Sequence, residues 1–335
     1  MKIRSCPFFA LVLSLLFSAC SLSSSCDLPR RGTVTLMTWN AQAFFDASEN
    51  GCEFAEYRGS GSVWSAARYV TRLDRLREVL FLAGRLASLG PDRSPDLVVL
   101  QEIENSGVIR DICNRLPASG RYREAVFVPP PAGCAFGSAI LSRYPLRSWS
   151  AHTVDSLGIP VRPLVEAEFL VDGIPLTVFA VHWKSKAGDA SDGGVRFAQE
   201  RLLAERIAAL RARSPGEAFI ACGDFNQRLE EFTLLEDASN PWVDWLDACA
   251  TGQVPGPAGS YWYDGAWETI DHIFYGGIIL CSFTVVSSPP AVTPEQVPAR
   301  YVIGTGAGYS DHLPLVLSFT LSGPDGTAVP ERSGD

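Results

Sequence analysis

Three of the four histidines in this chain stand in short motifs that carry a second polar group. His182 lies two residues before a lysine, and His272 and His312 each follow directly on an aspartate. Histidine gains and loses a proton near neutral pH, and a neighbouring carboxylate can hold a metal ion or orient the imidazole ring. One such histidine is as often structural as functional. Three of them together predict acid–base chemistry.

Further oxygen-bearing side chains stand where apolar runs of the sequence end. They are Asn40, Glu102, Asp224, Asn226, Asp271 and Asp311. Because ligand sites in open α/β sheets form where strand ends converge, we expect these groups to line one pocket. Carboxylate and amide oxygens are suitable ligands for Mg²⁺ or Mn²⁺. Residues 224 and 226 should face the same side of a strand, whereas the neighbours 311 and 312 should point in opposite directions and do different jobs.

Alternating or continuous apolar runs predict the strands that would position these groups. The predicted strands are 33–40, 97–100, 125–128, 139–142, 164–170, 176–182, 218–223 and 312–321. Helical periodicity predicts helices over 64–89, 108–116 and 195–213. Residues 143–163 are expected to form a loop that holds Arg143, Tyr144 and His152. The Asp264-Gly265 pair predicts a hairpin turn within 260–271.

Strands that alternate with a few long helices indicate one α/β domain with mixed sheets over residues 33–321. The sequence shows no internal repeat and no interdomain linker. The arginines of the first predicted helix are expected to form a solvated face opposite its apolar positions, and not a nucleic-acid contact. They are Arg68, Arg72, Arg75 and Arg77.

The two ends of the chain are predicted to lie outside this domain. Residues 1–19 read as a signal peptide, with Lys2 and Arg4 before a short apolar run that is too short to span a bilayer. The residues up to Cys20 resemble a bacterial lipobox, apart from Phe17, so we expect cleavage before Cys20 and a lipid on its thiol. Residues 20–32 would be a polar tether and 322–335 a disordered tail. The expected protein is an exported lipoprotein anchored in the bacterial cell envelope, periplasmic or at the surface; a soluble secreted product is the alternative.

The nine cysteines of an exported protein predict disulfides. Removal of Cys6 with the signal and lipidation of Cys20 leave seven, and Cys222, in a buried strand, is expected to be the unpaired one. Pairing, in an order that the sequence does not specify, is expected among Cys26, Cys52, Cys113, Cys134, Cys249 and Cys281. No spacing of cysteine and histidine indicates a zinc site. The net charge of −9 argues against a broad electrostatic contact with nucleic acid, although a local basic groove stays possible.

Six motifs, taken together and in order, resemble the endonuclease/exonuclease/phosphatase superfamily, which includes DNase I-like nucleases, abasic-site endonucleases, sphingomyelinases and inositol-polyphosphate phosphatases. The motifs are Thr38-Trp-Asn40, Leu100-Gln-Glu102, Val181-His-Trp-Lys-Ser185, Gly223-Asp-Phe-Asn226, Ile270-Asp-His272 and Ser310-Asp-His-Leu-Pro314. The resemblance covers residues 33 to about 320. It implies a four-layer α/β sandwich in which two mixed β-sheets lie face to face with helices outside.

The resemblance also implies which residues hold a metal ion. Glu102, supported by Asn40, would be the principal ligand for Mg²⁺ or Mn²⁺, and Asp311 would complete or orient that site. Asp224 would position and deprotonate the attacking water, or hold a second ion.

The remaining roles concern the phosphoryl group. Asn226 would hydrogen-bond its oxygen, and His182 and His312 would stabilise charge and serve as general acid and base. Asp271 would hold a histidine in its working tautomer. Outside the resemblance, the positive charge of Lys184 is suited to binding a substrate phosphate.

These expectations lead to a metal-dependent phosphodiesterase that acts on nucleic acid, as a monomer with no protein partner implied. The residues after His182 and the glycine-containing loop 188–194 resemble exported bacterial nucleases of the family. A sphingomyelinase-like or inositol-phosphate phosphoesterase is the second possibility, and a non-enzymatic surface lipoprotein the third. Six aromatic residues could stack bases or enter a lipid interface, although packing on the core is the simpler use for most: Trp242, Trp245, Tyr261, Trp262, Tyr263 and Trp267.

Overall fold

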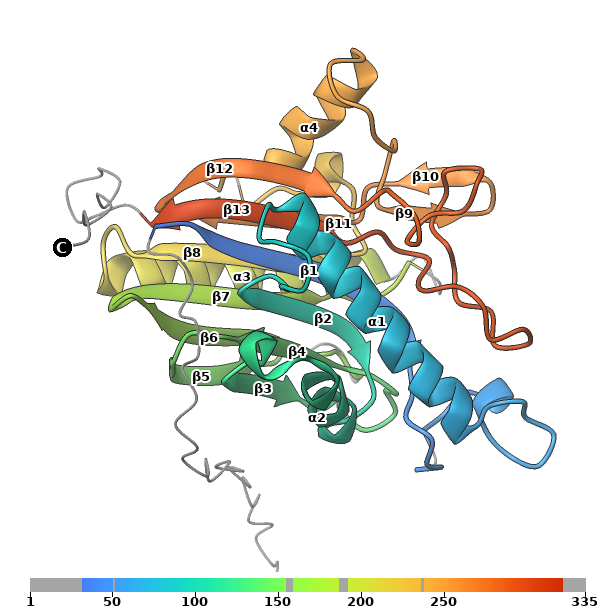
Figure 1. The fold of residues 1–335 in the computed structure, drawn as a ribbon. Coiled ribbons are helices and arrows are strands. Elements are labelled where there is room, and N and C mark those ends of the chain that lie inside the picture. The colour runs from blue at the N-terminus through green and yellow to red at the C-terminus, as the bar shows by residue number, and fades with distance from the viewer. Residues whose placement is uncertain (1–31, 51, 155–158, 187–191, 236–237, 322–335) are drawn as a thin grey trace, which may run out of the picture.

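The computed structural model describes residues 32–50, 52–154, 159–186, 192–235 and 238–321 (Figure 1). The expected signal peptide, nearly all of the tether, the tail and most of the glycine-containing loop lie outside the described residues. Within these residues, no helix has both the length and the apolar composition needed to cross a membrane.

Two β-sheets make up the centre of the molecule. The first has the order β12 (Ile278–Val285), β13 (Leu315–Leu321), β1 (Val34–Phe44), β2 (Leu97–Ile103), β4 (Gly137–Ser142) and β3 (Glu124–Val128). The second has the order β11 (Asp271–Gly276), β8 (Ala218–Asp224), β7 (Ile174–His182), β6 (Leu164–Val171) and β5 (Leu146–His152). Among the described strands, β1–β2 and β7–β8 are parallel and the other sheet neighbours are antiparallel, so both sheets are mixed, as predicted.

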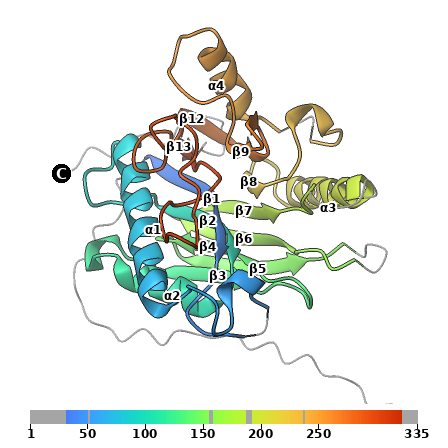
Figure 2. The same cartoon turned by 90° about the vertical axis from the view of Figure 1, so that its right-hand side faces the viewer.

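The helices lie outside the two sheets (Figures 1 and 2). Helices α1 (Ala66–Leu86) and α2 (Ser106–Arg115) cover the first sheet, and α3 (Asp192–Arg213) covers the second. Helix α4 (Pro241–Ala250) contacts β11 and β12 at one edge. The hairpin of β9 (Tyr261–Tyr263) and β10 (Ala266–Glu268) stands beside the sheets, with its turn where it was predicted. Single turns of 3-10 helix occupy Ala55–Tyr57, Ala118–Gly120 and Leu229–Glu231.

The apolar residues sort into layers by the two-residue period of the strands. Leu36 and Val99 from the first sheet meet Val178 and Ile220 from the second in the central cluster. The intervening Met37 and its neighbours face α1 and α2, and a third cluster lies beneath α3. The predicted four-layer α/β sandwich is therefore confirmed.

Several elements differ from the sequence prediction. Residues 146–152, predicted as loop, form the edge strand β5; its side chains are largely exposed, so no apolar alternation marks it. Helix α4 and strands β11 and β12 had not been predicted. The last strand begins at Leu315 instead of residue 312, and β1 continues to Phe44, four residues past Asn40. Arg72, expected in a solvated face, is only 2% exposed.

The expected disulfides are absent from the described residues. Cys222 is buried and free, as predicted, but the other five described cysteines are free as well, and the sixth expected partner, Cys26, lies outside the described residues. These five residues are carried by separate elements: Cys113 by α2, Cys249 by α4, Cys281 by β12, and Cys52 and Cys134 by loops.

Glycine is needed at position 223, immediately before Asp224, because strands β7 and β8 pack closely there. Its φ is +144°, and a Cβ at this position would overlap with the carbonyl oxygen of Val181 on β7. We predict that Gly223→Ala lowers the free energy of unfolding by about 3 kcal/mol, since the strands must separate locally. Urea denaturation measures the loss. Gly61→Ala, where a Cβ meets no atom within 4 Å, is the control, and equal stability of the two variants would contradict this account.

Candidate active site

The predicted polar residues come together at one edge of the sandwich. Asn40, Glu102, His182 and Asp224 lie at or near the carboxyl ends of the parallel pairs β1–β2 and β7–β8. Asp271 begins β11, and residues 311 and 312 directly precede β13. Because β11 and β13 run antiparallel to their neighbours, their amino ends reach the same edge.

The backbone changes direction where β1 and β2 enter the site. Gln42, Ala43 and Glu102 have φ values of 49°, 46° and 60°, and the pairing of β1 with β2 shifts register between Asn40 and Phe44. Non-glycine residues seldom adopt this left-handed conformation, and such residues cluster at functional sites. A side-chain contact supports the bend: the Gln42 amide donates to Asn40 Oδ1 at 3.0 Å.

Asn40 links the metal-ligand candidates of the two sheets. Its Nδ2 donates to Glu102 Oε1 at 3.1 Å and to Asp224 Oδ2 at 3.0 Å. The second carboxylate oxygen of Glu102 accepts from the Ala43 amide. Asn40 and Asp224 are almost fully buried. The three residues therefore form a connected group, as the sequence predicted for Asn40 and Glu102.

Burial and like charge oppose ionisation of the carboxyl groups here. Burial, together with Asp271, raises the pKa of Asp224 to about 7 in spite of the nearby His312. Burial and Glu102 likewise raise the pKa of Asp311. A divalent cation would relieve this repulsion, and the carboxylate and amide oxygens are the ligands that Mg²⁺ and Mn²⁺ prefer. The donor set therefore fits such an ion.

His312 and Asp271 form a buried pair. Nδ1 of His312 donates to Asp271 Oδ2 at 2.8 Å. Burial alone would lower the pKa of His312, but Asp271 and the nearby Asp224 and Asp311 raise it to about 10. His312 is thus protonated at neutral pH. The ring of Tyr261 stacks on it, with the centroids 4.5 Å apart.

His182 has the opposite environment. Burial, Arg162 and His312 lower its pKa well below 6.5. Its Nε2 accepts from Arg162 Nη2 at 2.9 Å and lies 3.8 Å from Asp224 Oδ2, and its Nδ1 has no hydrogen-bond partner among the described residues. The sequence prediction missed Arg162, which stands in the non-periodic stretch before β6; only its place directly before a proline and a strand marks it.

The remaining predicted residues lie close by. The Asn226 amide donates to Asp224 Oδ1 at 2.9 Å, and its Nδ2 donates to the Trp183 carbonyl at 3.2 Å. This turn holds the side chain beside Asp224. Lys184 is half-buried two residues after His182, with its Nζ 3.4 Å from the Ser185 carbonyl.

His272 does not belong to the site, so its predicted acid–base chemistry is wrong. It points into an aromatic cluster with Phe225 and Phe232, donates from Nε2 to the Gln227 carbonyl at 2.9 Å, and has Nδ1 3.1 Å from the Asn240 amide nitrogen. Burial lowers its pKa to about 4. Alternation along β11 turns His272 outward when Asp271 turns inward.

Aromatic side chains of the β9–β10 hairpin lie beside Asp311. Trp262 and Tyr263 from the hairpin, with Arg300 from the loop before β13, line a hollow of about 230 Å³ that includes Asp311. Tyr263 is 59% exposed, and Arg300 Nε lies 3.8 Å from Asp311 Oδ2. By contrast, Trp242 and Trp245 of α4 stack on each other and pack on the core. The hairpin aromatics Trp262 and Tyr263 thus line a surface hollow, whereas those of α4 are packed.

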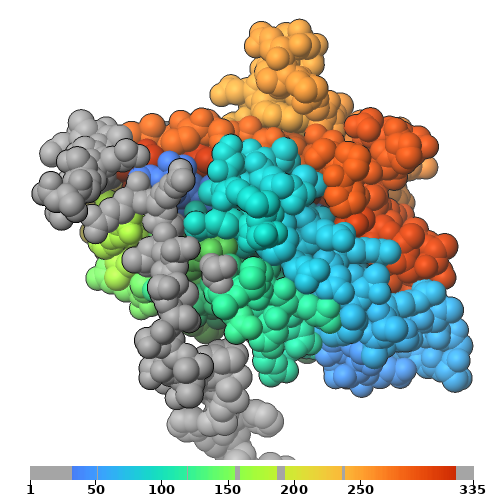
Figure 3. Space-filling model, viewed as in Figure 1, coloured from blue at the N-terminus to red at the C-terminus, as the bar shows by residue number. Residues whose placement is uncertain are grey.

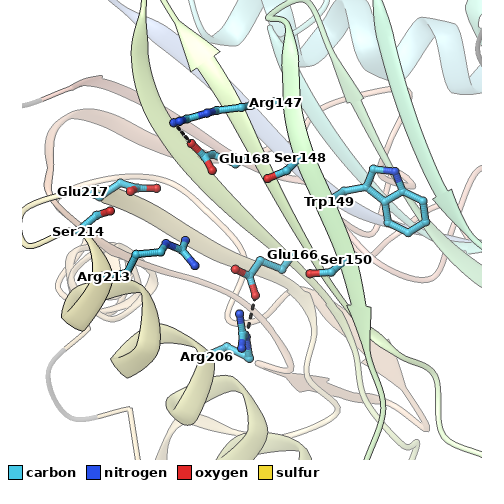
Figure 4. A pocket seen from close by; sticks show the side chains of 10 residues that line it. All are labelled: Arg147, Ser148, Trp149, Ser150, Glu166, Glu168, Arg206, Arg213, Ser214 and Glu217. Carbon is cyan, nitrogen blue, oxygen red and sulfur yellow. Dashed lines mark hydrogen bonds and ion pairs between the residues drawn. The ribbon is translucent and has the colours of Figure 1, made fainter.

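A second hollow lies on the outer face of the second sheet, between β5, β6 and α3 (Figure 4). Its charged residues largely neutralise one another: Arg147 pairs with Glu168 at 2.7 Å and Arg206 with Glu166 at 2.8 Å. Glu166 also pairs with His152 at 2.9 Å, a residue that was expected in a loop. None of the residues predicted for catalysis lines this hollow.

Comparisons with known proteins agree with this arrangement. The sequence model for the Endonuclease/Exonuclease/phosphatase family matches residues 37–312. The structure of truncated Caenorhabditis elegans TDP2 has a TM-score of 0.59 and 16% identity, over 87% of this chain and 98% of that chain. The human Nocturnin catalytic domain with bound sulfate anion has a TM-score of 0.52 and 18% identity, over 86% and 94%.

A third structure, the endonuclease/exonuclease/phosphatase from Bacteroides vulgatus, has a TM-score of 0.53 and 17% identity, over 87% of this chain and 100% of that chain. A search of the curated proteins finds no match. At these identities the likeness to the solved structures concerns the fold.

The environment of His272 predicts a pH-dependent contribution to stability. Its folded pKa, about 4, is below the ordinary value of 6.5, so the unfolded chain binds its proton first as pH falls. Its contribution is complete above pH 6.5 and is lost on the way down to pH 4. We expect the difference in unfolding free energy between wild type and His272→Gln to shrink by about 2 kcal/mol from pH 7 to pH 5. Urea titrations at both values measure it, and an unchanged difference would refute the assignment.

Proposed function

The chain belongs to the endonuclease/exonuclease/phosphatase family, and from this premise we propose that it is a divalent-metal-dependent phosphodiesterase that hydrolyses nucleic acid. The observation that carries the proposal is the hydrogen-bonded group formed by Asn40, Glu102 and Asp224 beside a protonated His312. This group combines oxygen ligands, a base and a cationic donor at one edge of the fold. Metal-assisted hydrolysis of a phosphodiester uses groups of these three kinds.

Glu102, Asn40 and Asp311 would hold the metal ion. Such an ion, when bound, polarises the phosphoryl oxygen and neutralises its charge. Asp224, Asp271 and His312 also present possible ligand atoms within 4.8 Å of one another. We prefer the first set, because a protonated His312 that donates to Asp271 offers no lone pair at Nδ1.

The other residues would act on water and on the phosphoryl group. Asp224, with a pKa of about 7, can orient a water molecule and accept its proton at neutral pH. The Nδ1 of His312 is engaged with Asp271, which leaves Nε2–H to stabilise charge on the phosphoryl oxygens. Asn226 and the Arg162–His182 pair would bind the same oxygens, and Lys184 would bind a flanking phosphate.

The hollow beside Asp311 supports nucleic acid as the substrate class. Trp262 and Tyr263 offer ring faces, and Arg300 offers a guanidinium that can pair with phosphate or stack on a base. Together with Arg162, Arg300 supplies local positive charge in a chain whose net charge is −9. Cleavage should then tolerate many sequences and weaken as salt rises.

The test is incubation of the full chain, in mild detergent, with supercoiled plasmid and Mg²⁺ or Mn²⁺. We expect nicking that EDTA abolishes, that falls at least 100-fold in Asp224→Asn and His182→Ala, and that is unchanged in Asp244→Asn on the surface of α4. Sphingomyelin vesicles and inositol phosphates are assayed in parallel. Release of phosphocholine or inorganic phosphate without nicking would move the assignment to a lipid or inositol phosphoesterase, and inactivity on every substrate would favour a scaffold without activity.

The metal site has a separate prediction. Glu102→Gln removes the charge of the principal ligand but keeps its shape, so the Mn²⁺ concentration for half-maximal rate should rise at least tenfold. Metal titrations of the rate measure the shift, and Glu205→Gln on the exposed side of α3 is the control. An unchanged metal dependence would exclude Glu102 as a ligand.

We also propose that the chain is exported and anchored through a lipid on Cys20, as its lipobox-like residues predict. In Cys20→Ser, the mass of the diacylglycerol-modified amino-terminal peptide should no longer be detected. The protein should also move from the detergent phase to the aqueous phase. Mass spectrometry and phase partition of protein made in a bacterial host check both. Wild-type protein with a free thiol at Cys20, or without cleavage, would contradict the anchor.

A further inference from the structure

Helix α1 carries a row of arginines that face backbone carbonyls. Arg68, Arg72 and Arg75 are three or four residues apart and therefore share one side of the helix. We call these three residues the arginine brace. Figures 1 and 3 show that the orange-red segment before β13 lies against α1, which is where two of these arginines make their contacts.

Arg72 holds the left-handed bend of β1. Its Nη1 donates to the Ala43 carbonyl at 2.8 Å, and its Nη2 donates to those of Ala41 and Gln42 at 2.7 and 2.6 Å. The guanidinium carbon lies 4.4 Å from the ring centre of Phe44 and 4.1 Å from that of Tyr301. One buried side chain thus gathers three successive carbonyls beside Asn40.

The other two arginines hold the segment that leads to Asp311. Arg68 donates to the Ile303 carbonyl and, at 3.1 Å, to that of Gly304. Arg75 donates to the carbonyl of Gly306 and, at 3.1 Å, to that of Gly308. All these acceptors belong to the backbone, so the arginine brace fixes the path of the chain and not its side chains.

Gln42 joins the two segments directly. Its Oε1 accepts from the amides of Tyr301 and Asp311 at 2.9 and 3.1 Å, and its Nε2 donates to the Tyr301 carbonyl at 3.2 Å. Ser310 Oγ adds a bond of 2.7 Å to the Asn40 carbonyl. The bend of β1 supports Glu102, because the Ala43 amide donates to its carboxylate. Through Gln42 the same bend is hydrogen-bonded to Asp311, which carries the second candidate ligand.

We propose that Arg72 is a positioning residue that sets the spacing between Glu102 and Asp311, and so the affinity of the site for a divalent cation. The proposal rests on the proposed function for the identity of these two ligands. A buried guanidinium that meets carbonyls and ring faces is costly compared with an apolar side chain.

The experiment is calorimetric titration of the full chain with Mn²⁺, without substrate, at a temperature where circular dichroism shows each variant folded. Arg72→Lys keeps the charge but replaces the rigid, planar fork of the guanidinium with a single ammonium nitrogen. We expect its Mn²⁺ affinity to fall at least tenfold, and turnover to fall with little change in KM. Arg77→Lys, on the same helix with an exposed ion pair to Asp74 at 3.7 Å, should match wild type.

Gln42→Ala provides the second test, since it leaves Arg72 in place and removes the link to Asp311. It should also weaken Mn²⁺ binding at least tenfold. The proposal would be overturned if folded Arg72→Lys and Gln42→Ala bound Mn²⁺ with wild-type affinity, even if both variants melted at a lower temperature. It would also be overturned if the wild type bound no Mn²⁺. A wild type that binds Mn²⁺ but cleaves no phosphodiester would refute the proposed function alone, because the affinities of the variants still decide the role of Arg72.

Discussion

The amide group of Asn40 is the contact on which the arrangement of the site depends. It reaches from the first sheet to Asp224 on the second, and to Glu102 on the neighbouring strand. Carboxylates removed from water need donors or cations in close reach. A single side chain that satisfies two of them therefore couples the polar edges of the sheets, while the apolar cluster between the sheets keeps them in register.

The burial of charged groups also gives His182 and His312 different protonation states. His182 and His312 are both buried, and burial by itself favours the neutral ring in each. Asp271 reverses this for His312, whereas Arg162 strengthens it for His182. The site thus holds a neutral and a charged imidazole a short distance from one base, Asp224. Pairs of titratable groups whose pKa values are shifted in opposite directions are the usual basis for assigning acid and base roles.

The backbone around these groups is held in conformations that few residues adopt. Gln42, Ala43, Glu102 and Asn226 all have positive φ values. Each takes part in a hydrogen bond that supports the bend. The Gln42 and Asn226 amides donate to the side chains of Asn40 and Asp224, Arg72 donates to the Ala43 carbonyl, and the Glu102 carboxylate accepts from the Ala43 amide. Such local strain persists only where the surroundings determine it. For the bend of β1, the contacts of α1 with Ala41 and Ala43 and with the segment before β13 supply those surroundings.

Much of this protein could be predicted from the sequence. Apolar runs that end in polar residues placed the candidate ligands at strand ends, and the alternation of strands with a few long helices indicated one α/β domain with mixed sheets, because both patterns are local. The layered sandwich was implied by the family resemblance of the motifs. The contacts between distant segments could not be read in this way. Arg72 and Arg77 were both expected in the solvated face of their helix, yet one is buried under the bend of β1 and the other is half-exposed.

His272 and His312 show the same limit, since each follows an aspartate. The register of β11 against β8 points the ring of His272 toward an aromatic cluster. The start of β13 beside β11 brings His312 within hydrogen-bond distance of Asp271. The sequence by itself determined the fold class and which residues could do chemistry. The tertiary structure decided which of them meet and in which charge state, because burial and partner charge are properties of the assembled neighbours and not of the residue.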